Sequence, residues 1–308
     1  MIRIEAKKYE GNPIFVPRIE AGSFEKGNVY NPAAVVKDGK VFLLYRAEEG
    51  YYDDYISRIG LATSEDGFAF ERFAKKPIID IDSTRTEEDR GCEDPRVMKA
   101  AGRYFLTYTA FGGGPTHTNT RLCGAFSHDL IRWKKIGKLL PGREKAGAVV
   151  QDYKHKGEYV MYFGEGKAQV AFSKDLSFWR VRKQPVLEPR EGFFDDFLVE
   201  PGPPPMVTEQ GILLIYNSAK GELGWRGQDD REFVSYAVGA ALFDKEDPTK
   251  LLWRTDAPLL EVSEYWEKYG KVNNVVFATG LVHFKDKWLL YYGGADKAIG
   301  VAELTFGA

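Results

Sequence analysis

The stretch NPAAVVKDGKVFLLYRA, residues 31–47, decides the fold of this 308-residue chain. A short apolar run meets a Lys-Asp-Gly-Lys turn, and a second apolar run follows and ends in Tyr-Arg. Two β-rich runs joined by a short glycine-containing turn are typical of a β-hairpin. The segment therefore predicts a hairpin whose first strand begins at Asn31.

The same plan recurs four more times, at residues 94–110, 146–165, 202–219 and 278–295. After each of the first three hairpins, a strand of small residues leads to Ser-x-Asp and then to an aromatic run. A unit of about four strands that recurs roughly every 50–75 residues is typical of a β-propeller. We therefore predict an all-β protein with the architecture of a five-bladed β-propeller.

The fifth repeat is short at its C-terminal end, and we expect an N-terminal strand at residues 2–5 or 12–16 to complete it. We expect one catalytic domain that spans residues 1–308. The alternatives are a β-sandwich and a two-domain all-β protein. A helical pattern is weak and is confined to residues 262–270.

Composition excludes several classes of function. The chain has 43 basic and 45 acidic residues, and this balance argues against nucleic-acid binding. An apolar run of about 18 residues, which a membrane span needs, is missing from the sequence. The first residues lack the apolar centre of a signal peptide, so we expect a cytoplasmic protein.

The two cysteines, Cys92 and Cys123, do not form a CxxC motif, which argues against a zinc site. We expect buried free thiols, with one disulfide as the alternative. We expect no metal and no cofactor, and the sequence does not indicate an oligomeric state.

In a propeller, the innermost strands of all blades line one central pocket. The residues that begin the five expected inner strands are Asn31, Asp94, Lys145, Glu200 and Thr279. The residues that end the second strands are Arg46, Thr109, Glu165, Asn217 and the pair at 295–296. Burying so many polar groups is costly unless they bind something, and sugar hydroxyls suit acids, amides and arginines. Two carboxylates across such a pocket are also the minimal equipment for cleaving a glycosidic bond.

The segment GCEDPRV, residues 91–97, belongs to a wider set of motifs that includes NPAAVV, SRIGLA, GPPP, GAALFDKEDPTK and YYGGADKAIGVA. This set resembles glycoside hydrolase family 130, which contains β-mannoside phosphorylases and β-mannosidases on a five-bladed propeller. The resemblance runs over nearly the whole chain. It implies that Asp94 is the general acid and delivers its proton through a hydroxyl of the bound mannose.

The resemblance also implies the residues that line the subsite for the non-reducing mannose: Asn31, Arg46, Arg58, Glu93, Arg96 and Asp296. We add Asn217 from the ring of polar strand ends. Arg96 has an equal alternative as a structural residue that pairs with Asp94 or Glu93. A neighbouring arginine would keep Asp94 ionised, whereas burial and Glu93 act in the opposite direction, and the sequence leaves this balance open.

Phosphorylases and hydrolases of this family differ in the nucleophile. The phosphorylases carry a lysine just before Gly-Pro-Pro-Pro, a histidine after the next hairpin strand and an arginine that closes the third hairpin. Here these regions read FLVEPGPPP, LIYNSAK and MYFGEG, so Glu200, Asn217 and Glu165 stand there instead. At an effective dielectric constant of about 20, one like-charge pair at about 4 Å costs about 4 kcal/mol, so a carboxylate opposes phosphate binding.

On this argument we interpret the chain as an inverting hydrolase of β-mannosides, most simply β-1,2-linked manno-oligosaccharides, with Glu200 as the general base. Glu165 and Glu232 are candidates for a second base. One alternative is an inverting β-mannoside phosphorylase that binds its anion through Arg121, Lys145 or His155. The other is a sugar-binding propeller without catalytic activity.

Overall fold

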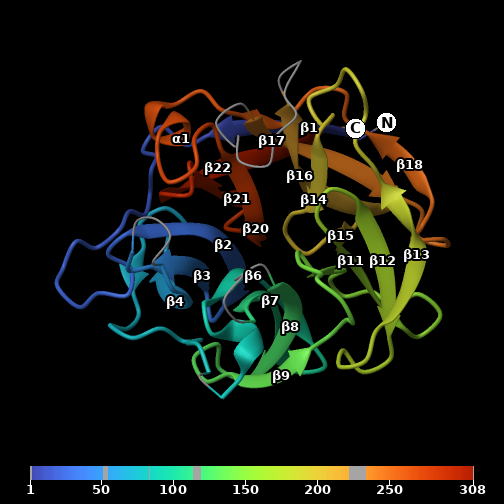
Figure 1. Ribbon diagram of the computed structural model, residues 1–308. Helices are drawn as coiled ribbons and strands as arrows, with labels where there is room; N and C mark the ends of the chain where they lie inside the picture. Colours follow the sequence, from blue (N-terminus) through green and yellow to red (C-terminus); the bar gives the residue numbers. More distant parts are fainter. Residues whose placement is uncertain (1, 51–54, 83, 114–118, 222–233, 308) are drawn as a thin grey trace.

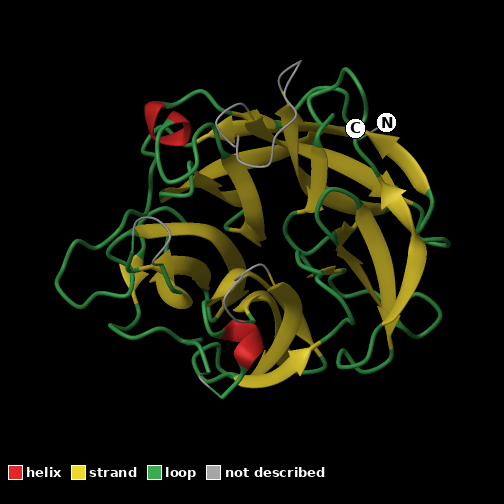
Figure 2. Cartoon of the chain, in the orientation of Figure 1, coloured by secondary structure: helices red, strands yellow, loops and turns green. Residues whose placement is uncertain are grey.

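The structure, a computed structural model, describes residues 2–50, 55–82, 84–113, 119–221 and 234–307. These residues form an all-β protein in which strands dominate, as Figure 2 shows. Figure 1 shows the sheets arranged around a common centre. The predicted fold class is confirmed, and the number of blades remains a prediction.

The first two predicted hairpins lie in one large sheet. Its strands are β2 (Asn28–Lys37), β3 (Lys40–Glu48), β4 (Ser57–Ser64), β6 (Gly91–Ala100), β7 (Arg103–Gly112), β8 (Asn119–Ser127) and β9 (Lys134–Lys138), with β5 (Glu71–Arg72) beside β4. Strands β4 and β6 pair in parallel only between Ser57 and Gly91. The sheet therefore consists of two four-stranded groups, β2–β5 and β6–β9.

Each of the other three sheets contains one further hairpin. One sheet has the order β10 (Ala148–Val149), β11 (Tyr159–Phe163), β12 (Ala168–Ser173) and β13 (Arg180–Leu187). The next has β14 (Leu198–Pro201), β16 (Ile212–Gly221), β17 (Val234–Phe243) and β18 (Leu251–Arg254), with β15 (Met206–Val207) and β19 (Leu260–Glu261) at its side. The last has β1 (Arg3–Lys8), β22 (Ala298–Gly307), β21 (Lys287–Gly294) and β20 (Val276–Phe284). All five predicted hairpins are antiparallel pairs.

The N-terminal strand completes the last sheet. Strand β1 pairs antiparallel with β22, with Ile4 opposite Phe306. Of the two predicted segments, residues 2–5 therefore supply the strand. Residues 12–16 contribute a single isolated bridge between Phe15 and Ile299.

The repeated Ser-x-Asp motif makes the same turn in three sheets. At the end of β4, Ser64 Oγ accepts a hydrogen bond of 2.8 Å from the backbone N–H of Gly67. Asp66 Oδ1 accepts two further backbone bonds, from residues 68 and 69. Equivalent bonds form at residues 127–132 and 173–178. Short polar side chains that satisfy nearby backbone groups explain why this motif marks the turns.

The apolar core lies between neighbouring groups of strands. One cluster joins β2–β4 to β6–β8 through residues such as Leu44, Ile59 and Leu106. Similar clusters join each later group to the next, and another joins the last sheet to the first through Tyr291 and Leu43. Burying one such large apolar side chain contributes about 1.5–3 kcal/mol. The packing therefore fixes neighbouring groups of strands relative to one another.

The inner strands differ from the prediction at their starts. Strands β2 and β6 begin at Asn28 and Gly91, three residues before Asn31 and Asp94. At Asn31 and Asp94 the pairing register shifts, and φ is 44° and 47°. Asn and Asp tolerate this left-handed conformation, and such a bulge changes the direction in which a side chain points. The predicted strand starts are therefore bulges at equivalent positions of two groups.

Two smaller predictions are confirmed. Cys92 and Cys123 are free and buried. A short helix, α1 (Tyr265–Lys268), lies within the predicted helical segment, and a 3₁₀ turn, η1 (Thr86–Glu88), precedes β6. No helix among the described residues has the length and apolar character that crossing a membrane requires.

Candidate active site

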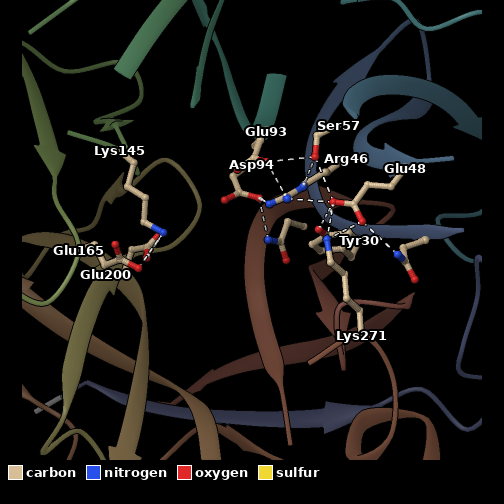
Figure 3. Close-up of polar contacts among 12 residues, drawn as sticks. Tyr30, Arg46, Glu48, Ser57, Glu93, Asp94, Lys145, Glu165, Glu200 and Lys271 are labelled. Atoms are coloured by element: carbon tan, nitrogen blue, oxygen red, sulfur yellow. Dashed lines mark hydrogen bonds and ion pairs between the residues drawn. The ribbon is translucent and has the colours of Figure 1, made fainter. Parts of the chain in front are cut away.

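One guanidinium, that of Arg46 on β3, connects four polar side chains at the centre of the molecule (Figure 3). Its Nη2 donates to Glu93 Oε1 at 2.7 Å and to Glu48 Oε1 at 2.9 Å. Its Nη1 donates to Asp94 Oδ1 at 3.2 Å, and its Nε donates to Ser57 Oγ at 3.0 Å. We call these five residues the Arg46 cluster. The structure thus brings Arg46, Glu93 and Asp94 together, as the sequence predicted.

The two adjacent acids of this cluster have opposite pKa shifts. Burial alone would raise the pKa of Asp94, but Arg46, Lys145 and a 2.8 Å hydrogen bond from Asn31 Nδ2 together lower it. Burial raises the pKa of Glu93, and the charges of Asp94 and Glu48 add to this effect against the opposing charge of Arg46. The balance that the sequence left open is therefore resolved: Asp94 is ionised in the ligand-free protein.

Two further residues predicted to line the sugar site are close to this cluster. Asn31 Oδ1 is buried and accepts no hydrogen bond from any residue that the structure describes. A buried acceptor normally has a partner, so this oxygen suits a ligand hydroxyl. Asp296 follows β21, and burial raises its pKa to about 6, with Asp94 and Glu48 adding to the rise and Arg46 and Lys271 opposing it.

A second group of charges lies opposite the Arg46 cluster. Lys145 Nζ is 2.8 Å from Glu165 Oε1 and 3.7 Å from Glu200 Oε2. Lys145 precedes β10, Glu165 follows β11 and Glu200 is on β14, so three separate segments meet here. We call these residues the Lys145 cluster. Figure 3 shows the two clusters facing each other, with the carboxylate of Asp94 on the side nearer to Lys145.

The charges of the Lys145 cluster also perturb one another. Burial raises the pKa of Glu200 to about 7, with Glu165 and Asp94 adding to the rise and Lys145 and Arg96 opposing it. Burial disfavours the charged form of Lys145, but the carboxylates of Glu200, Glu165 and Asp94 outweigh burial and raise its pKa. Lys145 therefore stays charged at neutral pH, and Glu200 takes up a proton far more readily than an exposed glutamate does.

Arg96 connects two chain segments instead of lining the sugar site. Its side chain is buried and donates to three backbone carbonyls, those of Asp94, Pro201 and Gly202. Its Nη2 is also 3.4 Å from Glu200 Oε1. A structural role for Arg96 therefore fits these contacts better than sugar binding does. The carboxylate that it pairs with is Glu200, and not Asp94 or Glu93 as the sequence suggested. With its donors used inside the protein, Arg96 holds β6 against β14.

Asn217 also has a structural position. Its Nδ2 donates to the carbonyl of Ala278 at 2.9 Å, and its Oδ1 accepts from the N–H of Ala278 at 2.7 Å. Both ends of the amide are therefore occupied by the backbone of β20. The prediction that Asn217 binds sugar is corrected, because this side chain joins β16 to β20.

The other predicted residues make their polar contacts with residues that belong to neither cluster, or lie outside the described residues. Arg58 on β4 donates from Nε to Asp80 Oδ1 at 2.7 Å. Arg121 Nη1 donates to the neighbouring backbone carbonyl of residue 120 at 2.7 Å. His155 is in the turn between β10 and β11, at the end of that hairpin opposite Lys145, which corrects its prediction as an anion ligand. Glu232 lies outside the residues that the structure describes.

Sequence reasoning missed Glu48, Ser57 and Lys271. Glu48 is fully buried and accepts hydrogen bonds from Tyr30, Arg46, Ser57 and Lys271. It stands two residues after Arg46, so strand periodicity places both side chains on one face and could have revealed it. Lys271 has no such local signal, because its segment is 223 residues away from Glu48.

Among the described residues, no three His, Cys, Asp or Glu side chains are placed to hold a metal ion together.

The sequence profile of a family described as β-1,4-mannooligosaccharide phosphorylase, glycoside hydrolase family 130, matches residues 5–307. The chain belongs to glycoside hydrolase family 130. The resemblance found in the sequence motifs is confirmed over nearly the whole chain.

Curated relatives of this family 130 protein are named phosphorylases. A 1,2-β-oligomannan phosphorylase from Thermoanaerobacter sp. (strain X514) is 38% identical to this chain, and the match covers 98% of this chain and 97% of the relative. A β-1,2-mannobiose phosphorylase from the same organism is 34% identical over 96% of this chain and 95% of its own length.

Solved structures agree with the family assignment. One of them is described with the statement that the GH130 family of mannoside phosphorylases contains glycoside hydrolases that target β-1,2 mannosidic linkages in Candida mannan. It superposes with a TM-score of 0.87 and 36% identity over 97% of this chain and 93% of that chain. The family thus holds both activities.

The curated relatives overturn the interpretation of this chain as a hydrolase. That interpretation counted Glu200 as a full negative charge and left Arg121, Lys145 and His155 to the phosphorylase alternative. Lys145 and Arg96 lie within 3.7 Å of Glu200 and offset its negative charge, and burial raises the pKa of Glu200 to about 7 against their influence. Repulsion between Glu200 and phosphate is therefore much weaker than the sequence suggested, and the assignment of Glu200 as a base for water is withdrawn.

Proposed function

We propose that this protein is an inverting β-mannoside phosphorylase that acts on β-1,2-linked manno-oligosaccharides and releases α-mannose 1-phosphate. The names and identities of the curated relatives support the substrate and the reaction. The observation that carries the proposal for this chain is the charged, partly buried Lys145, which lies opposite Asp94 and supplies the cation that a phosphate nucleophile needs.

In the proposed reaction, the bond between mannose C1 and the glycosidic oxygen breaks. A phosphate oxygen forms a new bond to C1 from the opposite face, so the β-mannoside becomes an α-phosphate. The departing oxygen takes a proton and leaves as a hydroxyl of the shortened oligosaccharide. Asp94 supplies this proton in our proposal, as its position in the family motif implies.

The Arg46 cluster supports a role in holding the terminal mannose. Asp94, Glu93, Asn31 and Asp296 offer acceptors for sugar hydroxyls, and Asn31 Oδ1 has no partner among the described residues. Arg46 fixes two of these carboxylates before the sugar arrives. Such preorganised polar groups favour binding in one orientation.

The Lys145 cluster supports a role in holding phosphate. Glu165, the present partner of Lys145, has a side chain that is 55% exposed, so phosphate can replace it at little cost. Glu200 in its protonated form is a hydrogen-bond donor and suits a phosphate oxygen. An anion can therefore bind opposite the sugar. Lys145 supplies the positive charge, Glu165 can be displaced, and protonated Glu200 can donate a hydrogen bond.

Phosphate binding also explains how an ionised Asp94 can become an acid. Lys145 is one of the charges that lower the pKa of Asp94. A phosphate dianion paired with Lys145 cancels that influence and adds negative charge, and a neighbouring negative charge raises the pKa of a carboxyl group. In our proposal the nucleophile thus prepares the acid that the reaction needs.

The fold behind this site is, in our proposal, a single domain of five blades. The groups β2–β5, β6–β9, β10–β13 and β14–β19 are four blades, and β20–β22 with β1 are the fifth. The apolar clusters between consecutive groups, including the last and the first, support a closed ring.

The test is product analysis after incubation with β-1,2-, β-1,3- and β-1,4-mannobiose, each with and without inorganic phosphate. We expect phosphate-dependent loss of β-1,2-mannobiose and a ³¹P NMR signal of α-mannose 1-phosphate. Free mannose released at a rate independent of phosphate would overturn the proposal in favour of hydrolysis. Binding of mannobiose without any product would overturn it in favour of a sugar-binding protein.

A further inference from the structure

Lys271 reaches the active site from the segment between α1 and β20, and the proposed function gives it no role. Its Nζ is 2.9 Å from Glu48 Oε1 and 2.8 Å from Glu48 Oε2 (Figure 3). The same Nζ lies 3.3 Å from the centre of the Tyr55 ring. Its side chain is 13% exposed and that of Glu48 is 0% exposed, so the ion pair is shielded from most of the solvent.

Glu48 and Glu93 share one nitrogen of Arg46, and each accepts a hydrogen bond from it. Arg46 Nη2 donates to Glu48 Oε1 at 2.9 Å and to Glu93 Oε1 at 2.7 Å. Ser57 Oγ lies between the same two carboxylates, 3.0 Å from Glu48 and 3.1 Å from Glu93. Among the described residues that contact Glu48, Lys271 is the one cation besides Arg46. Without Lys271, a fully buried carboxylate would therefore draw Arg46 toward itself and away from Glu93 and Asp94.

We propose that Lys271 is a positioning residue: it neutralises Glu48, and so leaves the guanidinium of Arg46 aimed at Glu93 and Asp94. The inference rests on the proposed function in one respect, namely that Glu93 and Asp94 contact the sugar. It does not depend on whether phosphate or water accepts the mannosyl group, because Lys271 acts on the Arg46 cluster.

The charges around Lys271 give the expected direction of its effect on pH dependence. The titratable and charged groups that face it come from β2, β3, β6 and the segments after β3 and β21: Tyr30, Arg46, Glu48, Tyr55, Glu93 and Asp296. Its positive charge opposes the rise in the pKa values of Glu93 and Asp296 that burial causes. Loss of this charge raises both pKa values further, so these carboxylates ionise only at higher pH.

The test compares Lys271→Met and Lys271→Arg with Lys183→Met, a control at an exposed lysine on β13. Rates are measured as loss of β-1,2-mannobiose between pH 4.5 and 8.5, so that either acceptor is detected. We expect Lys271→Met to lower kcat/KM by about ten- to hundredfold and to move the acid limb of its pH profile upward by at least half a pH unit. Lys271→Arg should recover most of the rate, and Lys183→Met should match the wild type.

A crystal structure of Lys271→Met provides a readout that needs no activity. We expect Arg46 Nη2 to stay with Glu48 and to lose its bond to Glu93. An unmoved Arg46 together with an unshifted pH profile would overturn the proposal, even if Lys271→Met lowers the melting temperature. Failure of the proposed function is distinguishable, because it changes the products of the wild type but not the geometry of Arg46 in the variant.

Discussion

The Arg46 cluster and the Lys145 cluster hold their charges in different ways. In the first, one guanidinium contacts three carboxylates, and the most exposed of these side chains is only 10% accessible. In the second, one ammonium contacts two carboxylates, and one of them, Glu165, is 55% exposed. The charged side chains of the first cluster are nearly all buried, whereas the second keeps a cation whose partner Glu165 reaches solvent.

This difference matches two kinds of ligand. A sugar presents many neutral hydroxyls at fixed positions, so groups that recognise it are best held rigid before it binds. Phosphate must enter as a free anion and leave as part of mannose 1-phosphate, so a cation with an exchangeable partner serves it better. The comparison therefore predicts that variants in the two clusters will have separable effects on stability and on each substrate.

The largest effect is expected from Asp94→Asn. This change removes the proton donor at nearly constant shape, and loss of such a group lowers rates by about 10²–10⁴-fold. The measurement is the initial rate of mannose 1-phosphate formation, with circular dichroism to confirm folding. Asp286→Asn, at an exposed turn with φ of 63°, is the matched control and should keep full activity. A variant that keeps even a tenth of the wild-type rate contradicts the role of Asp94.

The next effect concerns stability. Arg46→Met leaves three carboxylates without their shared cation, and breaking a buried ion pair costs about 3–5 kcal/mol. Lys145→Met should cost much less, because Glu200 already has a pKa near 7 and can protonate. Urea unfolding at pH 7 measures both free energies of unfolding. Equal losses in the two variants would refute the contrast between a rigid and an exchangeable cluster.

A smaller effect is expected from Glu200→Gln, which keeps a hydrogen-bond donor and removes a titrating group. Burial raises the pKa of Glu200 to about 7, so the wild type loses its donor form as pH rises through 7. We expect the KM for phosphate to rise severalfold between pH 6.5 and 8.5 in the wild type and less in the variant. Complete inactivity of Glu200→Gln at every pH would instead indicate that Glu200 acts as an essential base.

The smallest effect is expected from Glu165→Gln. An ion pair with a solvent-exposed carboxylate contributes about 0–1 kcal/mol, so its loss frees Lys145 without disturbing the fold. The KM for phosphate should fall by up to about fivefold, while the KM for mannobiose stays unchanged. Steady-state kinetics at varied phosphate concentrations provides the measurement, and a higher KM for phosphate would show that Glu165 helps phosphate to bind.

Much of the fold could be predicted from the sequence because each hairpin is a local pattern. The strand, turn and strand are adjacent in the chain, and Ser-x-Asp satisfies its own turn. The bulges at Asn31 and Asp94 could not be predicted as bulges, because their register depends on the partner strand. Both lie before a proline, a residue that removes a ladder hydrogen bond, so the sequence does carry one local signal for them.

The candidate site was predicted where family motifs mark it, as at Glu93, Asp94 and Arg46. The prediction failed where a role depends on distant partners. Asn217 looked like a ligand but is bonded to the backbone of β20, and Lys271 reaches Glu48 from 223 residues away. The charge of Glu200 was misjudged for the same reason, since its burial and its two cations come from other sheets.

The central claim is that the Lys145 cluster binds phosphate and the Arg46 cluster binds sugar. Its most direct test is the pair of KM values, for phosphate and for β-1,2-mannobiose, in the wild type and in Lys145→Met. The account predicts a KM for phosphate at least tenfold higher in the variant and a KM for mannobiose within twofold of the wild type. A KM for phosphate that is unchanged in Lys145→Met, or a turnover that needs no phosphate in either protein, would contradict it.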